Sequence, residues 1–208
     1  MWFAQQWNEK RVRACLRQQD PHQLAEFVKA RHYERFFRPL KTIRAAPGNM
    51  QGYGAAIMAL CSLLIETIQC YRFGLPTTDG KEFRKLAKRK GIPAPYQLHA
   101  NEWKSGTKTF QRFFHDHRDI FQALPGGRFY KNVRCGLLHQ GQTKRGWVIK
   151  RRGLRVWDPT RKTIYRNDFS ESLERAFKAY LGDLRTSRWG DRICRRAARK
   201  VWWLLRLS

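Results

Sequence analysis

The stretch that decides the fold lies between residues 52 and 72 and reads GYGAAIMALCSLLIETIQCYR. A membrane span needs about 20 predominantly apolar residues, whereas Ser62 and Glu66 interrupt this run. A helix that is apolar on nearly all sides is buried among other elements. We therefore expect the central helix of a helical protein and no transmembrane segment.

Helical spacing of apolar residues recurs on both sides of this stretch. Asp20-Pro21 starts a helix that Pro47-Gly48 breaks, and Asp168 with Glu171 caps a late one. The remaining helices are expected over about residues 3–18, 81–90, 107–121, 128–139 and 169–185, with a turn at Leu124-Pro-Gly-Gly. Residues 52–72, 107–121, 128–139 and 169–185 form the predicted core bundle.

Two segments near the C-terminus differ from this pattern. Residues 144–166 alternate between apolar and polar side chains, with turn signals at Arg152-Gly153 and Asp158-Pro159. This predicts a small antiparallel β-hairpin or meander. Residues 188–208 form a basic amphipathic helix that either lies on an anionic surface or docks on the core. The sequence thus predicts one mainly α domain over 1–187, followed by the helix 188–208.

The chain is strongly basic: 208 residues carry 43 Lys and Arg against 16 acidic residues, a formal charge of +27. With 42% hydrophobic residues it is expected to fold rather than remain disordered. Such a charge favours a phosphate-rich partner. The alternative is that the charge only keeps the protein soluble. We expect RNA as the partner.

The cysteines indicate a reducing compartment. There are five, and none forms a CxxC pair, so neither a disulfide framework nor a thiolate zinc site is expected. The N-terminal residues lack the basic and apolar regions of a signal peptide. We expect a cytoplasmic protein.

Several catalytic and cofactor motifs are absent from the sequence. There is no Walker loop, no GxGxxG, no HExxH and no GxSxG. Residues His115-Asp116-His117 point about 100° apart on a helix and lack further ligands, which argues against a metal site. No metal and no cofactor is expected.

An arginine followed by histidine five residues later occurs three times, at Arg17–His22, Arg112–His117 and Arg134–His139. So basic a chain is expected to contain such pairs by chance. The first spans Asp20-Pro21, which breaks the helix. The second lies on a helix that continues past it. The third encloses Gly-Leu-Leu and ends at Gln140-Gly141, at the C-terminal edge of a helix.

The segment FYKNVRCGLLHQGQTK, residues 129–144, contains the third pair. It resembles the motif of HEPN-domain ribonucleases (higher eukaryotes and prokaryotes nucleotide-binding), in which His follows Arg after four to six residues. The resemblance implies an all-α, HEPN-like bundle and a metal-independent endoribonuclease of the toxin or phage-defence type. It also implies a homodimer with two motifs meeting at the interface, with products carrying 2′,3′-cyclic phosphates. An antitoxin or sensor protein would be a further partner.

The residue types suit RNA cleavage. Histidine can accept or donate a proton near neutral pH, and arginine can fork onto two phosphate oxygens. On one helix the pair lies about 140° apart, so two facing helices make a better site. We assign Arg134 and His139 as catalytic, with Glu66, Asn132 and Gln140 in support. Glu66 either pairs with Arg134, or points to a rim or pairs with another arginine.

Two alternatives to a nuclease remain open. In the first, the protein binds RNA or DNA without cleaving it, with Trp147 and Trp157 stacking bases. In both the nuclease and this alternative, the predicted phosphate contacts are Lys131, Lys144, Arg145, Lys150, Arg151, Arg152 and Arg155. In the second, helix 188–208 docks on a membrane surface or a partner.

Overall fold

The computed structural model describes residues 2–46, 52–88, 91–97 and 106–207. It is mainly helical, with 67% of residues in helices and 7% in strands, which confirms the predicted mainly α fold class. The chain divides into two compact units. Unit 1 comprises Met1–Arg35, Thr67–Ser105 and Lys178–Ser208, and unit 2 comprises Phe36–Glu66 and Gly106–Phe177. The single domain over 1–187 stays a prediction.

Unit 1 begins with an antiparallel hairpin where the sequence predicts a helix from residue 3. Phe3 and Trp7 of the hairpin pack their rings on Phe27, and the side chain of Asn8 caps the helix that follows. The elements of unit 1 are β1 (Trp2–Ala4), β2 (Trp7–Asn8), α1 (Glu9–Gln18), α2 (Pro21–His32), α5 (Gly80–Ala87), η2 (Ala94–Tyr96) and α10 (Arg192–Leu207). The π-helical turn η1 (Tyr33–Phe37) follows α2.

The predicted central helix is α4 (Tyr53–Phe73), and its end is closely fixed within unit 1. Gly74 has a positive φ, and the N–H of Leu75 donates to the Cys70 carbonyl at 2.8 Å, as in a Schellman motif. Arg199 of α10 donates to the carbonyl oxygens of Phe73 and Gly74 at 2.7 and 3.0 Å. A cation at this position also complements the negative end of the helix dipole.

Helix α10 packs against the other elements of unit 1, and docking on the core was one of the two predicted arrangements. Arg199 and Lys200 are 5% and 8% exposed, and Lys200 Nζ donates to the Pro76 carbonyl at 2.7 Å. Trp203 is buried as well. Two of the cations expected on a solvated basic face therefore bind backbone carbonyls inside the unit.

Among the described residues, α4 is long and apolar enough to cross a membrane by length and composition alone. Half of the apolar stretch of α4 is buried inside the structure, and the core helices of soluble proteins can be equally long and apolar. This finding is compatible with the predicted absence of a transmembrane segment.

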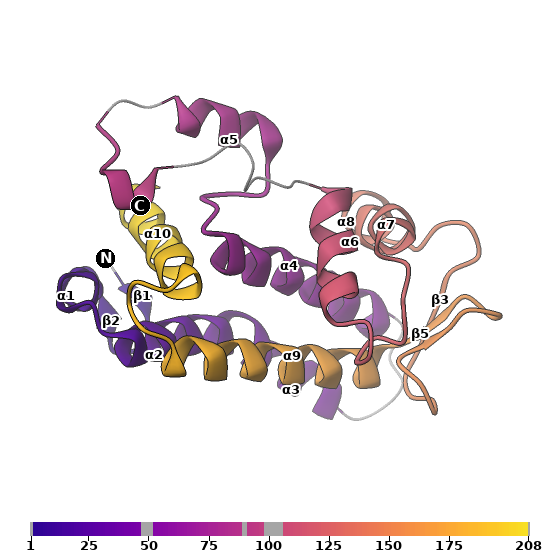
Figure 1. The fold of residues 1–208 in the computed structure, drawn as a ribbon. Helices are drawn as coiled ribbons and strands as arrows, with labels where there is room; N and C mark the ends of the chain where they lie inside the picture. Colours follow the sequence, from indigo (N-terminus) through magenta and orange to yellow (C-terminus); the bar gives the residue numbers. More distant parts are fainter. Residues whose placement is uncertain (1, 47–51, 89–90, 98–105, 208) are drawn as a thin grey trace. The chain divides into compact units, whose positions relative to one another are not determined.

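Unit 2 is built around a cluster of phenylalanines. Phe129 and Phe169 stack with ring centroids 5.4 Å apart, and Phe114 meets both rings edge-on. The elements are α3 (Arg38–Ala45), α6 (Thr107–Asp116), α7 (Gly126–Phe129), η4 (Tyr130–Arg134), α8 (Cys135–Gln140), three strands, and the larger parts of α4 and α9 (Arg166–Thr186). Helices α6 and α7 pack against each other (Figure 1).

Two helix boundaries, the start of α7 and the end of α6, differ from the predicted ones. The expected turn at Leu124-Pro-Gly-Gly starts a helix instead, because Gly126 faces α6. A Cβ on Gly126 would lie 2.5 Å from the Phe110 carbonyl oxygen, so glycine permits the contact. Helix α6 ends at Asp116 rather than near residue 121.

The predicted β segment contains β3 (Val148–Lys150), β4 (Trp157–Asp158) and β5 (Thr163–Tyr165). Their order is β3-β5-β4. The predicted antiparallel pairing is confirmed for β4 and β5, but β3 pairs with β5 in parallel. The loop 151–155 is exposed and carries the chain back so that β3 joins the sheet at the other edge of β5.

Helix α9 starts at Arg166, ahead of its predicted cap at Asp168. The two acids of the expected capping box instead bind the loop 151–155. Asp168 accepts a hydrogen bond from the Gly153 N–H at 3.2 Å, and Glu171 accepts one from Arg152 at 2.9 Å. The local sequence predicts that these acids cap the helix. Instead, Asp168 and Glu171 bind residues that lie 15 and 19 positions earlier in the chain.

Candidate functional site

The predicted helix over 128–139 exists as the run α7, η4 and α8, which ends at Gln140. Its middle is a π-helical turn, in which the Cys135 N–H donates to the Tyr130 carbonyl. Such turns insert an extra residue into a helix and often occur at functional sites. The run closes at Gly141, whose positive φ fits a helix end. Arg134 is the last residue of the π turn η4, and His139 lies in α8, which follows it.

Arg134 and Glu66 form a forked ion pair. Arg134 Nε donates to Glu66 Oε1 at 2.9 Å, and Nη2 donates to Oε2 at 3.4 Å. Their side chains are 20% and 12% exposed. This is the first of the two arrangements that the sequence left open for Glu66. Although burial lowers the pKa of Arg134, the hydrogen bond and charge of Glu66 outweigh it and raise that pKa.

Within the residues that the structure describes, the ion pair leaves part of the Arg134 guanidinium without a hydrogen-bond partner. Five N–H groups radiate from an arginine head group, and Glu66 engages Nε and one side of Nη2. Nη1 and the outer N–H of Nη2 remain on the opposite edge. These groups can donate in parallel to two oxygens of a phosphate. Glu66 thus orients Arg134 without using its whole fork.

His139 and Gln140 are exposed at the end of α8. His139 is five residues after Arg134, which on a helix places the two side chains about 140° apart. The exposed surface around the ion pair is partly apolar. Leu63 lies one turn before Glu66 on α4, and Leu138 lies one turn after Arg134; their exposed fractions are 37% and 36%.

Asn132, predicted as a supporting residue, is buried and faces another part of unit 2. Two positions along a helix separate it from Arg134, so the two side chains lie on roughly opposite sides of the helix. Asn132 lines a pocket, whereas Arg134 contacts Glu66. The structure thus assigns them to different surroundings.

The other two Arg–His pairs lie in different settings. Arg17 and His22 are on separate helices, and the Asp20 side chain between them accepts from the His22 N–H. Arg112 pairs with Asp116 at 2.8 Å, and the His117 ring lies 4.7 Å from that of Phe113. The prediction that the helix continues beyond His117 is wrong, since α6 ends at Asp116.

The predicted phosphate contacts all belong to unit 2. Lys144 is half-buried, and the exposed ones are Lys131, Arg145, Lys150, Arg151, Arg152 and Arg155. Arg152 also pairs with Asp168 and Glu171. Its charge is thus partly neutralised by acids, unlike that of a cation with water as its only neighbour.

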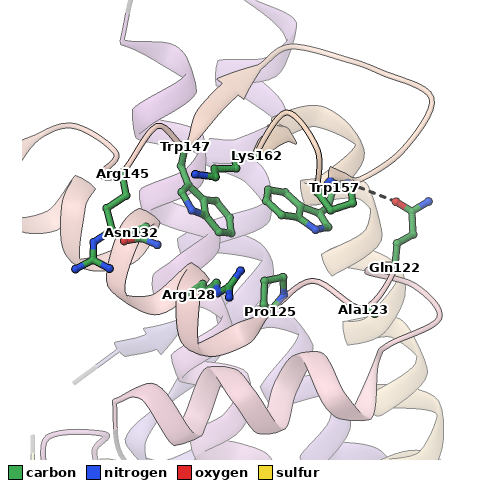
Figure 2. A pocket seen from close by; sticks show the side chains of 10 residues that line it. Gln122, Ala123, Pro125, Arg128, Asn132, Arg145, Trp147, Trp157 and Lys162 are labelled. Carbon is green, nitrogen blue, oxygen red and sulfur yellow. Dashed lines mark hydrogen bonds between the residues drawn. The ribbon is translucent and has the colours of Figure 1, made fainter.

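A pocket of about 560 Å³ lies beside the same helical run (Figure 2). Trp147 and Trp157 form one wall, stacked with ring centroids 4.4 Å apart and 6% and 5% exposed. Lys162 lies beside the indoles, and Arg128 lies across from them. Arg145 occupies the end near Asn132 (Figure 2). The sequence identified the tryptophans and Arg145 but missed Arg128 and Lys162.

The two tryptophans differ from the open platforms expected for stacking bases. Each indole covers one face of the other, so a ligand can meet an outer face or an edge only. The start of β4, which carries Trp157, is also anchored, because Gln122 Oε1 accepts from the Val156 and Trp157 N–H groups at 3.0 and 3.4 Å. The indoles are a fixed wall of the pocket.

No protein-family model, curated protein or solved structure matches this chain.

Proposed function

We propose that the protein is a metal-independent endoribonuclease of the toxin or phage-defence type, with Arg134 and His139 in a site formed by two subunits. The observation that carries the proposal is the Glu66–Arg134 ion pair. It holds one edge of the guanidinium and leaves the other edge to face a phosphate. A cytoplasmic location and an antitoxin or sensor partner belong to the same proposal.

Cleavage needs three things that these residues supply. A base removes the proton of the RNA 2′-hydroxyl, and the oxygen attacks the adjacent phosphorus. An acid gives a proton to the departing 5′-oxygen, and a cation stabilises the charged phosphorane. Two copies of His139 provide the base and the acid, and Arg134 provides the cation. The products carry 2′,3′-cyclic phosphate and 5′-hydroxyl ends.

Exposed leucines beside the ion pair support a second copy as the neighbour. Leu63 and Leu138 are each more than a third exposed and flank Glu66 and Arg134 along their helices. Homodimer interfaces are more apolar than the remaining surface. A second copy covering this face brings two Arg134–His139 pairs together, which compensates for the wide angle between them on one helix.

The proposal is tested by incubating the purified protein with RNA in EDTA and mapping the product ends. We expect cleavage that EDTA leaves unchanged, with cyclic phosphate at the 3′ ends. Cleavage lost in EDTA and restored by a divalent cation contradicts the mechanism.

The dimer is tested with Leu63→Asp, measured by light scattering after gel filtration. We expect this variant to be monomeric and inactive. Leu207→Asp is the matched control, because Leu207 is 46% exposed near the end of α10 in unit 1; it should leave mass and activity unchanged. A monomeric wild-type protein that cleaves RNA rules out the composite site.

A second function is favoured by the exposed cations of the loop 151–155. In it the protein binds RNA without cutting it, and Arg151 and Arg155 contact phosphates. His139→Ala distinguishes the two functions, since it should abolish cleavage in the first and change nothing in the second.

A further inference from the structure

The pocket between the tryptophans and Arg128 combines apolar walls with unbalanced positive charge. Three cations line it, Arg128, Arg145 and Lys162, and no acidic side chain does. Among the described residues, no carboxylate pairs with any of the three. Free cations around a hollow favour an anionic ligand.

Asn132 adds a directional polar group to the same pocket. It is 7% exposed, and within the described part of the chain no hydrogen bond reaches its side-chain amide. The amide atoms are not among the fully buried polar atoms that lack a partner, so solvent in the pocket reaches them. A ligand with donors and acceptors of its own would satisfy the amide, as the edge of a nucleobase does.

Backbone conformation singles out this pocket as well. Six non-glycine residues of the described chain have positive φ angles, and four of them line the pocket: Gln122, Ala123, Arg145 and Lys162. Such residues are strained, and they cluster at binding sites. The Gln122 side chain has a structural task, since it binds the Val156 and Trp157 N–H groups.

Within the described part of the chain, the side chains of Arg145 and Lys162 form no hydrogen bond or ion pair. The Trp147 N–H donates to the Lys144 carbonyl across Arg145 and Gly146, both with positive φ. These are features of a type I′ turn, which favours Asn, Asp or Gly at its first central position. Lys162 occupies another position that glycine would fill more easily, with a φ of 47°. A long cation at both places points to a need for its charge.

We infer that this pocket binds a nucleoside phosphate, with the base against the wall of Trp147 and Trp157 and the phosphate on Arg128, Arg145 and Lys162. The volume of about 560 Å³ lies in the range of small-molecule sites. The ligand is either a free nucleotide or one nucleotide of an RNA chain. The inference does not depend on RNA cleavage, because Arg134 and His139 are not among the lining residues.

Calorimetric titrations of AMP, adenosine, inorganic phosphate and a short oligoadenylate test this inference. The protein carries His139→Ala, so that cleavage neither consumes the oligonucleotide nor affects the result. We expect AMP or the oligoadenylate to bind more tightly than adenosine and phosphate, each of which supplies half of the contacts. Saturable binding of AMP identifies a free nucleotide as the source, and binding of the oligoadenylate alone identifies a nucleic acid.

Glycine substitutions separate binding from folding. Arg145→Gly and Lys162→Gly remove a cation while relieving backbone strain, so their melting temperatures should be equal to or above that of the parent. We expect each to weaken binding by about tenfold or more. Gln19→Gly is the backbone control, since Gln19 has a φ of 55° in unit 1. Arg17→Ala is the charge control, since Arg17 is exposed on α1 in unit 1.

The controls should leave affinity within about twofold, a change well below the loss of one charged hydrogen bond. The inference is overturned if both pocket variants bind as the parent does, or if they and Arg17→Ala weaken binding equally. It is also overturned if inorganic phosphate binds as tightly as AMP, because the base would then contribute nothing.

Discussion

Arg134 Nε donates to Glu66 Oε1 at 2.9 Å, and this contact joins residues 68 positions apart in the sequence. It connects the central helix α4 to the end of the π turn η4. Because Nη2 also reaches Oε2, the plane of the guanidinium is held as well as its position. Glu66 is therefore a positioning residue for Arg134.

Glu66→Gln should lower kcat by about tenfold or more while the Kd for RNA stays within about twofold, because it loosens Arg134 and adds no charge repulsion. Single-turnover cleavage and filter binding measure the two quantities. The free energy of unfolding should fall by about 1–3 kcal/mol. Glu9→Gln is the control, since Glu9 pairs with Arg13 on the exposed surface of α1. Unchanged kcat in Glu66→Gln would remove Glu66 from the mechanism.

Arg199→Ala should destabilise the protein by about 2–4 kcal/mol, because it leaves buried carbonyl oxygens of residues 73 and 74 without donors. Arg195→Ala, an exposed position on the same helix, should change the free energy of unfolding by less than about 0.5 kcal/mol. Urea unfolding compares them. Equal effects would mean that the buried cation does not stabilise unit 1.

Stability should decrease as the pH falls from about 6.5 to 4, partly through His32. Burial lowers the pKa of His32 to about 4, so the unfolded chain takes up a proton in this window and the folded protein does not. The contribution is complete above about pH 6.5 and lost towards pH 4, at most about 3 kcal/mol. His32→Gln should flatten this dependence, and exposed His22→Gln should not. An unchanged slope in His32→Gln would assign the dependence to other groups.

RNA affinity should fall steeply with salt. A protein contacting six to ten phosphates loses about 10³–10⁵ in affinity between 50 and 200 mM salt. Arg151→Ala should reduce the slope of log Kd against log salt by about 0.7–0.9. Arg152→Ala should reduce it less, because Arg152 already pairs with Asp168 and Glu171. A nearly flat salt dependence would exclude the basic surface as the binding site.

The regular helices were predictable because their patterns are local. The spacing of Phe169, Leu173 and Phe177 identifies α9, and Asp20-Pro21 identifies the start of α2. The predictions fail where contacts between residues far apart in the sequence determine where a helix begins or ends. Gly126 begins a helix because it fits against the Phe110 carbonyl, and Asp168 binds the Gly153 N–H instead of capping α9.

For the candidate site, residue chemistry anticipated part of the arrangement. A single carboxylate in an apolar helix needs a partner, which made Arg134 a candidate partner for Glu66, with a rim position or another arginine as the alternative. The pocket was not predictable as a pocket, since Arg128 comes from helix α7 and Lys162 from the turn between β4 and β5. Their positions depend on packing between segments, and their sequence neighbours contain no motif. Positive φ angles at Arg145 and Lys162 likewise become visible only in three dimensions.

The most direct test of the nuclease proposal compares His139→Ala with His117→Ala in the same RNA cleavage assay in EDTA. Both histidines follow an arginine by five residues. Any difference between the two variants therefore comes from their structural surroundings and not from the sequence spacing. We predict that His139→Ala lowers the cleavage rate by about 10²–10⁴, the usual contribution of a general acid or base, with RNA affinity nearly unchanged. His117→Ala should cleave like the wild type. Full activity in His139→Ala, or loss of activity in His117→Ala, would contradict the assignment.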